Sequence, residues 1–215
     1  MLRKSISELL GTFALVFCGT GAIVIDQETG GGVSHIGVAI TFGLIVMAMI
    51  YALGEVSGAH LNPAVSIAFT FAGRLPVKSL GYYIVSQIAG ALLASITLKL
   101  LFPSNQLLGT TLPAGTALQS FILEFILTYF LMLVIINVST GPKEQGLFAG
   151  IAIGSVILLE AMFAGPICGA SMNPARSIAP AIVSGHHETL WIYVFAPVTG
   201  AASAIPTWKY LNIKK

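Results

Sequence analysis

Apolar residues dominate six long stretches of the chain, which are separated by short polar or glycine-rich segments. A transmembrane helix needs roughly 20 mostly apolar residues to cross about 30 Å of hydrocarbon, and each of these stretches is close to that length. The pattern therefore predicts an all-α membrane protein with six transmembrane helices. They cover residues 5–25, 36–53, 80–102, 117–138, 147–164 and 189–208.

Two shorter apolar stretches, residues 62–72 and 173–183, are too short to cross a bilayer. They open with Asn62-Pro63-Ala64 and Asn173-Pro174-Ala175. Proline is favoured in the first turn of a helix, and asparagine is a good N-cap. Irregular backbone at membrane depth is tolerated only where protein buries it or where it lines a wet cavity. We therefore expect two re-entrant half-helices beside a water-filled path.

The two halves of the chain repeat each other. Residues 58–66 align with residues 169–177 at an offset of 111, and residues 7–13 resemble residues 123–129. Each half holds three spans, so the second half enters the membrane from the opposite side. The sequence thus predicts one channel domain over residues 1–215, built as an inverted repeat with halves of about 1–108 and 109–215, an architecture that places a site near the midplane.

Composition agrees with a lipid environment. Hydrophobic residues make up 56% of the chain and charged residues 8%, against about 25% charged in soluble proteins, and this low charge argues against nucleic-acid binding. No convincing signal-cleavage site precedes Asp26, so residues 1–25 are expected to remain as the first helix. Cys18 and Cys168 have no CxxC partner or metal-ligand spacing, which is typical of buried structural cysteines.

The distribution of basic residues predicts the orientation. Lysine and arginine collect in cytoplasmic loops, and a cytoplasmic N-terminus places eight of the ten basic residues inside. Both termini are then cytoplasmic, in the plasma or inner membrane of the cell. The exceptions are Lys99, which we expect to snorkel, and Arg176. The eight are Arg3, Lys4, Arg74, Lys78, Lys143, Lys209, Lys214 and Lys215.

The two half-helices also carry an electrostatic prediction. Their N-termini meet at mid-membrane, and each contributes roughly half a positive charge, so a passing cation is repelled. Asn62 and Asn173 are expected to keep amide donors free for a passing oxygen, which interrupts a proton relay through water. A lone arginine in an apolar segment usually faces a water-filled path, which favours Arg176 as a pore residue over a snorkelling one.

The paired motifs, preceded by Ser57-Gly58-Ala59-His60-Leu61 in the first half and followed by Arg176 in the second, resemble the major intrinsic protein family of aquaporins and glycerol facilitators. The resemblance covers nearly the whole chain. It implies six tilted helices with two half-helices, a homotetramer with one pore per subunit, and no cofactor or metal. It also implies a vestibule role for His60 and a selectivity filter formed by Phe42, Ala161, Ala170 and Arg176.

The filter positions depart from the two main subgroups of that family. Strict water pores usually carry histidine where Ala161 stands, and glycerol facilitators usually carry aspartate where Ser177 stands. Two alanines opposite Phe42 and Arg176 predict a wider opening. Gly165-Pro166 and Trp191-Ile192-Tyr193 resemble nodulin-like members, which implies passive passage of water, glycerol, urea or metalloid acids such as boric and arsenous acid. A strict water channel is the alternative.

Four acidic residues lie in or near apolar segments. Glu8 and Glu124 occupy matched places in the repeat, so each is expected to accept hydrogen bonds from the N–H groups of a re-entrant loop. Glu55 is expected to be solvated at a mouth of the channel. Glu160 is turned about 100° from Ala161 on a helix, which favours a loop-bracing role, with the pore mouth as the alternative.

The histidines offer little further chemistry. The family resemblance implies that His60 orders its loop, with core packing or a pH gate as alternatives. His35 begins the second span, and His186-His187 form a polar part of an outer loop, with too few neighbouring ligands for a metal.

Two other classes share some of these features. A secondary transporter also uses inverted repeats, but it needs an ionisable coupling group at its substrate site, for which Glu160 is the best candidate. An intramembrane enzyme needs a nucleophile with its base, or metal ligands at suitable spacing, and the sequence shows no such set. A passive channel is therefore favoured.

Overall fold

The structure is a computed structural model, and it describes residues 1–140 and 146–212. Lys143, Lys214 and Lys215, which contribute to the predicted charge asymmetry, lie outside these residues. Six helices in the described part are long and apolar enough to cross a membrane, and two are short. In chain order the eight are α1 (Leu2–Glu28), α2 (Ser34–Ser57), α3 (Pro63–Phe71), α4 (Val77–Leu101), α5 (Ala117–Thr140), α7 (Ala149–Cys168), α8 (Pro174–Ser184) and α9 (Leu190–Leu211).

The six predicted spans and the two half-helices are confirmed, with small shifts at their ends. The six long helices run for 20 to 27 residues, with mean hydropathy of 1.3 to 2.4 in their most apolar windows. At about 1.5 Å per residue, even the shortest of them spans the hydrocarbon core. The largest differences lie at the ends of α2 and α7, which each continue four residues beyond the predicted end, α2 to Ser57 and α7 through Pro166 to Cys168.

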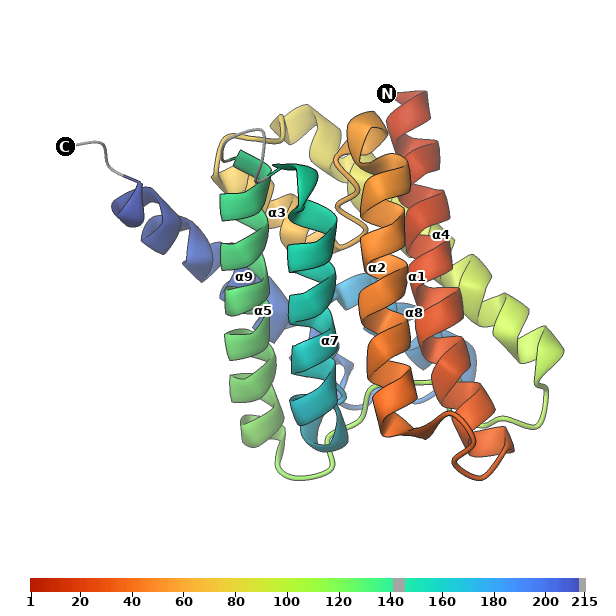
Figure 1. The fold of residues 1–215 in the computed structure, drawn as a ribbon. Coiled ribbons are helices and arrows are strands. Elements are labelled where there is room, and N and C mark those ends of the chain that lie inside the picture. The colour runs from red at the N-terminus through yellow and green to blue at the C-terminus, as the bar shows by residue number, and fades with distance from the viewer. Residues whose placement is uncertain (141–145, 213–215) are drawn as a thin grey trace.

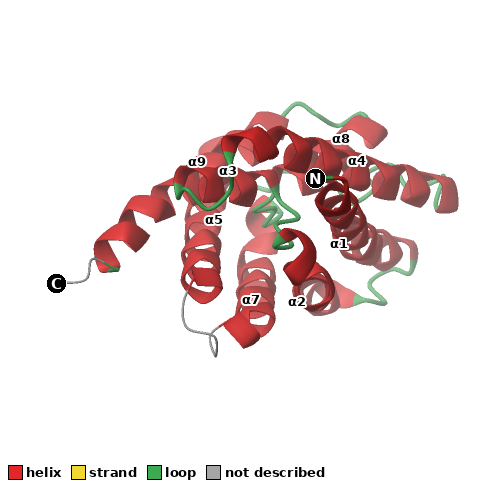
Figure 2. Cartoon of the chain, turned by 90° about the horizontal axis from the view of Figure 1, so that it is seen from above, coloured by secondary structure: helices red, strands yellow, loops and turns green. Residues whose placement is uncertain are grey.

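The long helices surround the two half-helices. α5, α7, α2 and α1 stand side by side across Figure 1, while α9 and α4 lean away at the two ends of this row. Seen from above, α3 and α8 lie behind the row, near α9 and α4 (Figure 2). α3 packs against α9 and α8 packs against α4, so each half-helix is held by a long helix of the other half of the chain.

The same close helix contacts occur in both halves. A Cβ atom added at Gly90 of α4 would overlap the carbonyl oxygen of Leu9 in α1, and one added at Gly200 of α9 would overlap that of Phe125 in α5. These glycines are 110 residues apart, in line with the predicted repeat. In lipid, small residues allow the backbone approach on which helix association depends, so the glycines fix the frame around the half-helices.

α2 and α7 contact each other directly through their backbones. A Cβ atom at Gly43 would lie 2.6 Å from the carbonyl oxygen of Gly154, and a Cβ atom at Gly154 would lie 2.7 Å from that of Gly43. Neither glycine can be replaced without moving one of the helices. This contact matters for the site because α2 and α7 carry two of the predicted filter residues, Phe42 and Ala161.

Candidate functional site

The two Asn-Pro-Ala motifs begin α3 and α8, as the capping signals predicted. The Asn62 side-chain oxygen accepts a hydrogen bond from the Ala64 N–H at 2.9 Å, and that of Asn173 accepts from the Ala175 N–H at 3.0 Å. Both asparagines have extended backbone, and a proline follows in the first turn. The prolines lack only an N–H that has no helical partner in the first turn, so each half-helix starts sharply at its motif.

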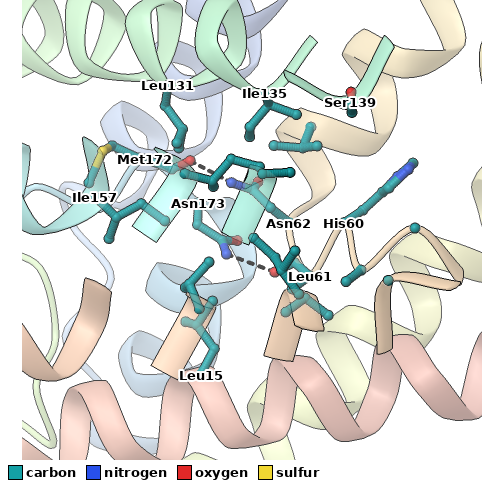
Figure 3. Close-up of a pocket in the computed structure, with 18 of the residues that line it drawn as sticks. Leu15, His60, Leu61, Asn62, Leu131, Ile135, Ser139, Ile157, Met172 and Asn173 are labelled. Atoms are coloured by element: carbon teal, nitrogen blue, oxygen red, sulfur yellow. Dashed lines mark hydrogen bonds between the residues drawn. The ribbon is translucent and has the colours of Figure 1, made fainter. Parts of the chain in front are cut away.

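The two motifs are linked to each other through their asparagine amides. The Asn62 Nδ2 group donates to the Met172 carbonyl at 2.7 Å, and the Asn173 Nδ2 group donates to the Leu61 carbonyl at 2.8 Å (Figure 3). The expectation that these amide donors are free therefore needs correction. Each Nδ2 group has two hydrogens, and only one of them remains for a passing molecule, because the facing loop supplies a carbonyl at hydrogen-bond distance.

The loops before the two motifs have matching, uncommon backbone. Ala59 and Leu61 in the first loop, and Ala170 and Met172 in the second, have φ values between 40° and 54°. Non-glycine residues reach this left-handed region only when their surroundings over-determine it. The same pattern in both loops shows that the repeat extends to local backbone geometry.

Two buried carboxylates hold these loops. Glu8 accepts from the His60 N–H at 3.0 Å and the Leu61 N–H at 2.8 Å, and Glu124 accepts from the Ser171 N–H at 2.7 Å and the Met172 N–H at 2.8 Å. Both glutamates are fully buried. The hydrogen bonds satisfy loop N–H groups that have no helical partner, which is the geometry expected from the repeat.

A cavity of about 440 Å³ lies between the two motifs and the row of long helices. Asn62 and Asn173 both contribute to its wall, and so do all four predicted filter residues, Phe42, Ala161, Ala170 and Arg176, which the fold brings together from α2, α7, the second loop and α8. The cavity wall also includes the polar residues His60, Glu55 and Ser139.

Most of the remaining wall is apolar and was not predicted. The apolar character of a residue does not show which side of its helix it occupies. The internal repeat, however, indicates which apolar residues line the cavity. Phe42, Val46 and Ile50 follow one another at intervals of four on α2, and the residues 111 positions later, Ile153, Ile157 and Ala161, line the same cavity from α7. Leu15, Leu131 and Ile135 complete this wall (Figure 3).

Arg176 lies inside the protein, so the snorkelling alternative is wrong. Its side chain is 2% exposed, its Nη1 group donates to the Gly109 carbonyl at 2.7 Å, and its guanidinium carbon lies 5.1 Å from the centre of the Phe42 ring. The Nε group has no partner among the described residues. The arginine is thus fixed on one side and keeps donor capacity on another.

His60 is held in its loop by both polar and aromatic contacts. Its Nδ1 atom is 3.1 Å from the Ser66 hydroxyl, and its ring stacks on Phe69 with centroids 4.6 Å apart and lies 5.0 Å from the Tyr83 ring. The residue is half-buried at the cavity wall. This geometry suits the expected loop-ordering role and leaves little room for the ring to swing.

Other residues named from the sequence have simpler surroundings. Glu55 is exposed and lines the cavity. Glu160 is buried, but it is absent from the cavity wall, and its Oε2 atom has no partner among the described residues. The structure thus places Glu160 outside the cavity wall and shows no hydrogen bond from a loop to that oxygen among the described residues.

The outlying basic residue and the cysteines also have clear positions. Lys99 lies at the end of α4, where its amine donates to the carbonyls of Pro103 and Asn105 at 3.0 and 3.2 Å. Cys168 is buried, Cys18 is half-buried, and both are free thiols. None of the three contributes to the cavity wall.

Comparison with known proteins agrees with this arrangement. The Major intrinsic protein family model matches residues 1–208. The chain is 47% identical over 214 residues to Aquaporin NIP1-1 of Zea mays, covering 99% of this chain and 75% of that protein. It is 46% identical over 211 residues to Nodulin-26 of Glycine max, covering 97% and 77%. An aquaglyceroporin structure from Plasmodium falciparum superimposes with a TM-score of 0.89 at 27% identity, covering 99% of this chain and 97% of the other.

Six apolar helices around two facing half-helices and an internal cavity define a multi-pass membrane channel. The chain belongs to the major intrinsic protein family. It is therefore a channel for water and small solutes rather than an enzyme.

Proposed function

We propose that the cavity between the two motifs is the conducting pore, and that residues 1–215 form one channel domain of two inverted halves. The observation that carries this proposal is the convergence of both Asn-Pro-Ala motifs and the four filter positions on one cavity. A path bounded by two capped half-helices has polar groups near the motifs, at Arg176 and at Glu55 and Ser139, while most of its remaining wall is apolar.

The filter favours solutes larger than water. Ala161 and Ala170 are the small residues of the constriction, and they line the same cavity as Phe42 and Arg176. An apolar wall facing an arginine suits a neutral solute that has hydroxyl or amide groups on one side only. Glycerol, urea and undissociated metalloid acids such as boric and arsenous acid have this character, and similarity to an aquaglyceroporin supports the glycerol assignment.

Ions and protons should be excluded at two levels. The N-termini of α3 and α8 place two partial positive charges near the asparagines, and the buried guanidinium of Arg176 adds a full charge at the filter. A cation meets both, whereas a neutral solute exchanges its water contacts for these fixed donors. The channel therefore conducts passively and needs no coupled ion.

The orientation follows from the described charges. Arg3 and Lys4 lie in the first turn of α1, and Asp26 and Glu28 lie at its other end. Arg74 belongs to the connection between α3 and α4 and Lys78 to the first turn of α4, and this connection lies at the same end of the molecule as the N-terminus (Figure 1). With basic residues inside, both termini are cytoplasmic in the plasma or inner membrane.

Many large apolar side chains on the outer helix faces are exposed, and a homotetramer with one pore per subunit would cover part of them.

Stopped-flow measurements on proteoliposomes test the pore assignment. Outward gradients of glycerol, urea and boric acid should each give faster relaxation than in protein-free vesicles, and water should also pass. Solute flux that required a proton or sodium gradient would contradict a passive channel. Water flux without any solute flux would support a strict water channel instead. Native mass spectrometry of the purified channel tests the assembly, with the mass of four chains expected.

A further inference from the structure

Pro166 lies within α7, two residues before its end. A proline has no N–H to donate to the carbonyl four residues earlier, so the Met162 carbonyl loses its usual helical donor. In a membrane protein such a carbonyl is generally satisfied by a neighbouring group. Met162 directly follows Ala161, so the freed carbonyl belongs to the part of α7 that carries the filter.

His35 supplies the missing donor. Its Nε2 atom lies 2.7 Å from the Met162 carbonyl oxygen, although the two residues are 127 positions apart. A carbonyl oxygen only accepts hydrogen bonds, so the hydrogen of the imidazole is on Nε2. His35 lies in the first turn of α2, and the bond therefore joins the start of α2 to the last turns of α7.

Gly165 makes room for this bond. A Cβ atom at Gly165 would lie 2.7 Å from the Cε1 atom of His35, too close for the ring to keep its position. Gly165 and Pro166 thus act together, because one admits the imidazole and the other frees the carbonyl that the imidazole binds. Their adjacency gives the Gly-Pro pair in α7 a defined structural purpose.

We propose that His35 is a positioning residue of the filter. Its bond to Met162 gives the freed carbonyl a donor and so holds the last turns of α7, which carry Ala161, in the cavity wall that Phe42 also lines. The Gly43–Gly154 contact fixes α7 farther along the helix, so the hydrogen bond at Met162 is what sets the position of Ala161 relative to Phe42. This inference rests on the proposed function only in taking those two residues as the constriction.

A rescue experiment separates this role from a general structural one. In His35→Ala the Met162 carbonyl loses its donor, and the ratio of glycerol to water permeability should shift by roughly two- to tenfold, the range expected from one lost hydrogen bond. In the double variant His35→Ala, Pro166→Ala, residue 166 regains an N–H that can bond to Met162 within the helix. The wild-type ratio should then return, and Pro166→Ala alone should keep it.

Two further variants keep the test decisive if His35→Ala does not fold. His35→Gln retains a side-chain amide donor and should keep the ratio, whereas Gly165→Ala displaces the ring and should shift the ratio as His35→Ala does. His187→Ala, an exposed histidine outside the cavity, is the matched control and should match the wild type. The unfolding midpoint of each purified variant is recorded alongside.

The outcomes distinguish this inference from the proposed function. If the wild type passes glycerol and His35→Ala keeps its ratio, or if Pro166→Ala fails to restore a shifted ratio, the inference is wrong. If the wild type passes no solute, the proposed function fails, and the midpoints decide the inference. The inference is supported if His35→Ala lowers the unfolding midpoint of the wild type but not that of Pro166→Ala. It is contradicted if His35→Ala lowers both midpoints by the same amount.

Discussion

Asn62 and Asn173 each donate an amide hydrogen bond to the carbonyl of the residue immediately before the other, at 2.7 and 2.8 Å. Each asparagine also caps its own half-helix through its side-chain oxygen. One side chain thus begins a half-helix and ties it to the opposite loop. The paired motifs therefore line the cavity and also hold each other in place through these two hydrogen bonds. The bonds fix the N-termini of α3 and α8 relative to each other.

Replacing Asn173 by aspartate should weaken cation exclusion. The carboxylate keeps an oxygen that can cap Ala175, but it removes the donor to Leu61 and adds a negative charge where the two half-helices meet. That charge offsets the two positive ends, each worth roughly half a charge. We expect sodium and proton permeability to rise, as measured with entrapped fluorescent dyes.

Asn137→Asp provides the control for this charge change. Asn137 lies in α5, where its amide donates to the Leu133 carbonyl, and it is outside the cavity wall. The control should leave cation permeability unchanged. If Asn173→Asp folds and remains as tight to cations as the wild type, the dipole ends do not exclude cations at this point.

Glu8→Gln and Glu124→Gln should each destabilise the protein. The two oxygens of each carboxylate accept two loop N–H groups, whereas a glutamine has only one acceptor oxygen and presents an NH2 group to the second N–H. One buried donor is then unpaired, at a cost of about 1–3 kcal/mol. The unfolding midpoint in detergent should fall for both variants.

Glu188→Gln makes the same chemical change at an exposed position, and its midpoint should equal that of the wild type. Equal midpoints for all three variants would show that the loops do not depend on the carboxylates. A fall in only one of the two buried variants would mean that the two halves of the repeat are unequally braced.

Local signals explain how much of this structure could be predicted from the sequence. The spans follow from apolar length, and the half-helix starts follow from a capping asparagine before a proline. The amide bonds of Asn62 and Asn173 could not be predicted, because their acceptors lie 110 and 112 residues away in loops of left-handed backbone. The hydrogen bond from His35 to Met162 could not be predicted either, because the two residues are 127 positions apart.

The pore wall was missed for a different reason. An apolar residue in a membrane helix can face lipid, a neighbouring helix or a pore, and its identity does not distinguish these. Ile157 is such a residue, yet the offset of 111 pairs it with Val46, and both line the cavity. If the offset is applied to every position, and not to the motifs alone, a lining residue of one half predicts its counterpart in the other half.

Arg176→Ala should admit cations and protons while leaving water flux in place. The variant removes the buried positive charge and the donor to Gly109, and it leaves Phe42 without the guanidinium above its ring. Arg176→Lys keeps the charge on a single amine and loses the planar set of donors. It should therefore retain more cation exclusion than alanine but lose part of the glycerol flux.

Arg74→Ala is the matched control. Arg74 lies outside the cavity, with its guanidinium carbon 5.8 Å from the centre of the Trp208 ring, and its removal should change neither cation nor glycerol permeability. Unaltered charge selectivity in Arg176→Ala would remove this residue from the exclusion mechanism. Cation leak in both alanine variants would point to a general loss of packing instead.

Ala161→His should convert the filter toward water selectivity. The side chain at this position lines the cavity together with Phe42 and Arg176, so an imidazole there narrows the opening and adds a polar group to a largely apolar wall. Glycerol and urea should lose more permeability than water, with a fall in the solute-to-water ratio of about tenfold or more, the lower range for a change in pocket size. Ser155→His, at an exposed position of the same helix outside the cavity, should keep the wild-type ratio. Because both variants add one imidazole to α7, a similar ratio in the two would show that Ala161 does not set the width of the pore.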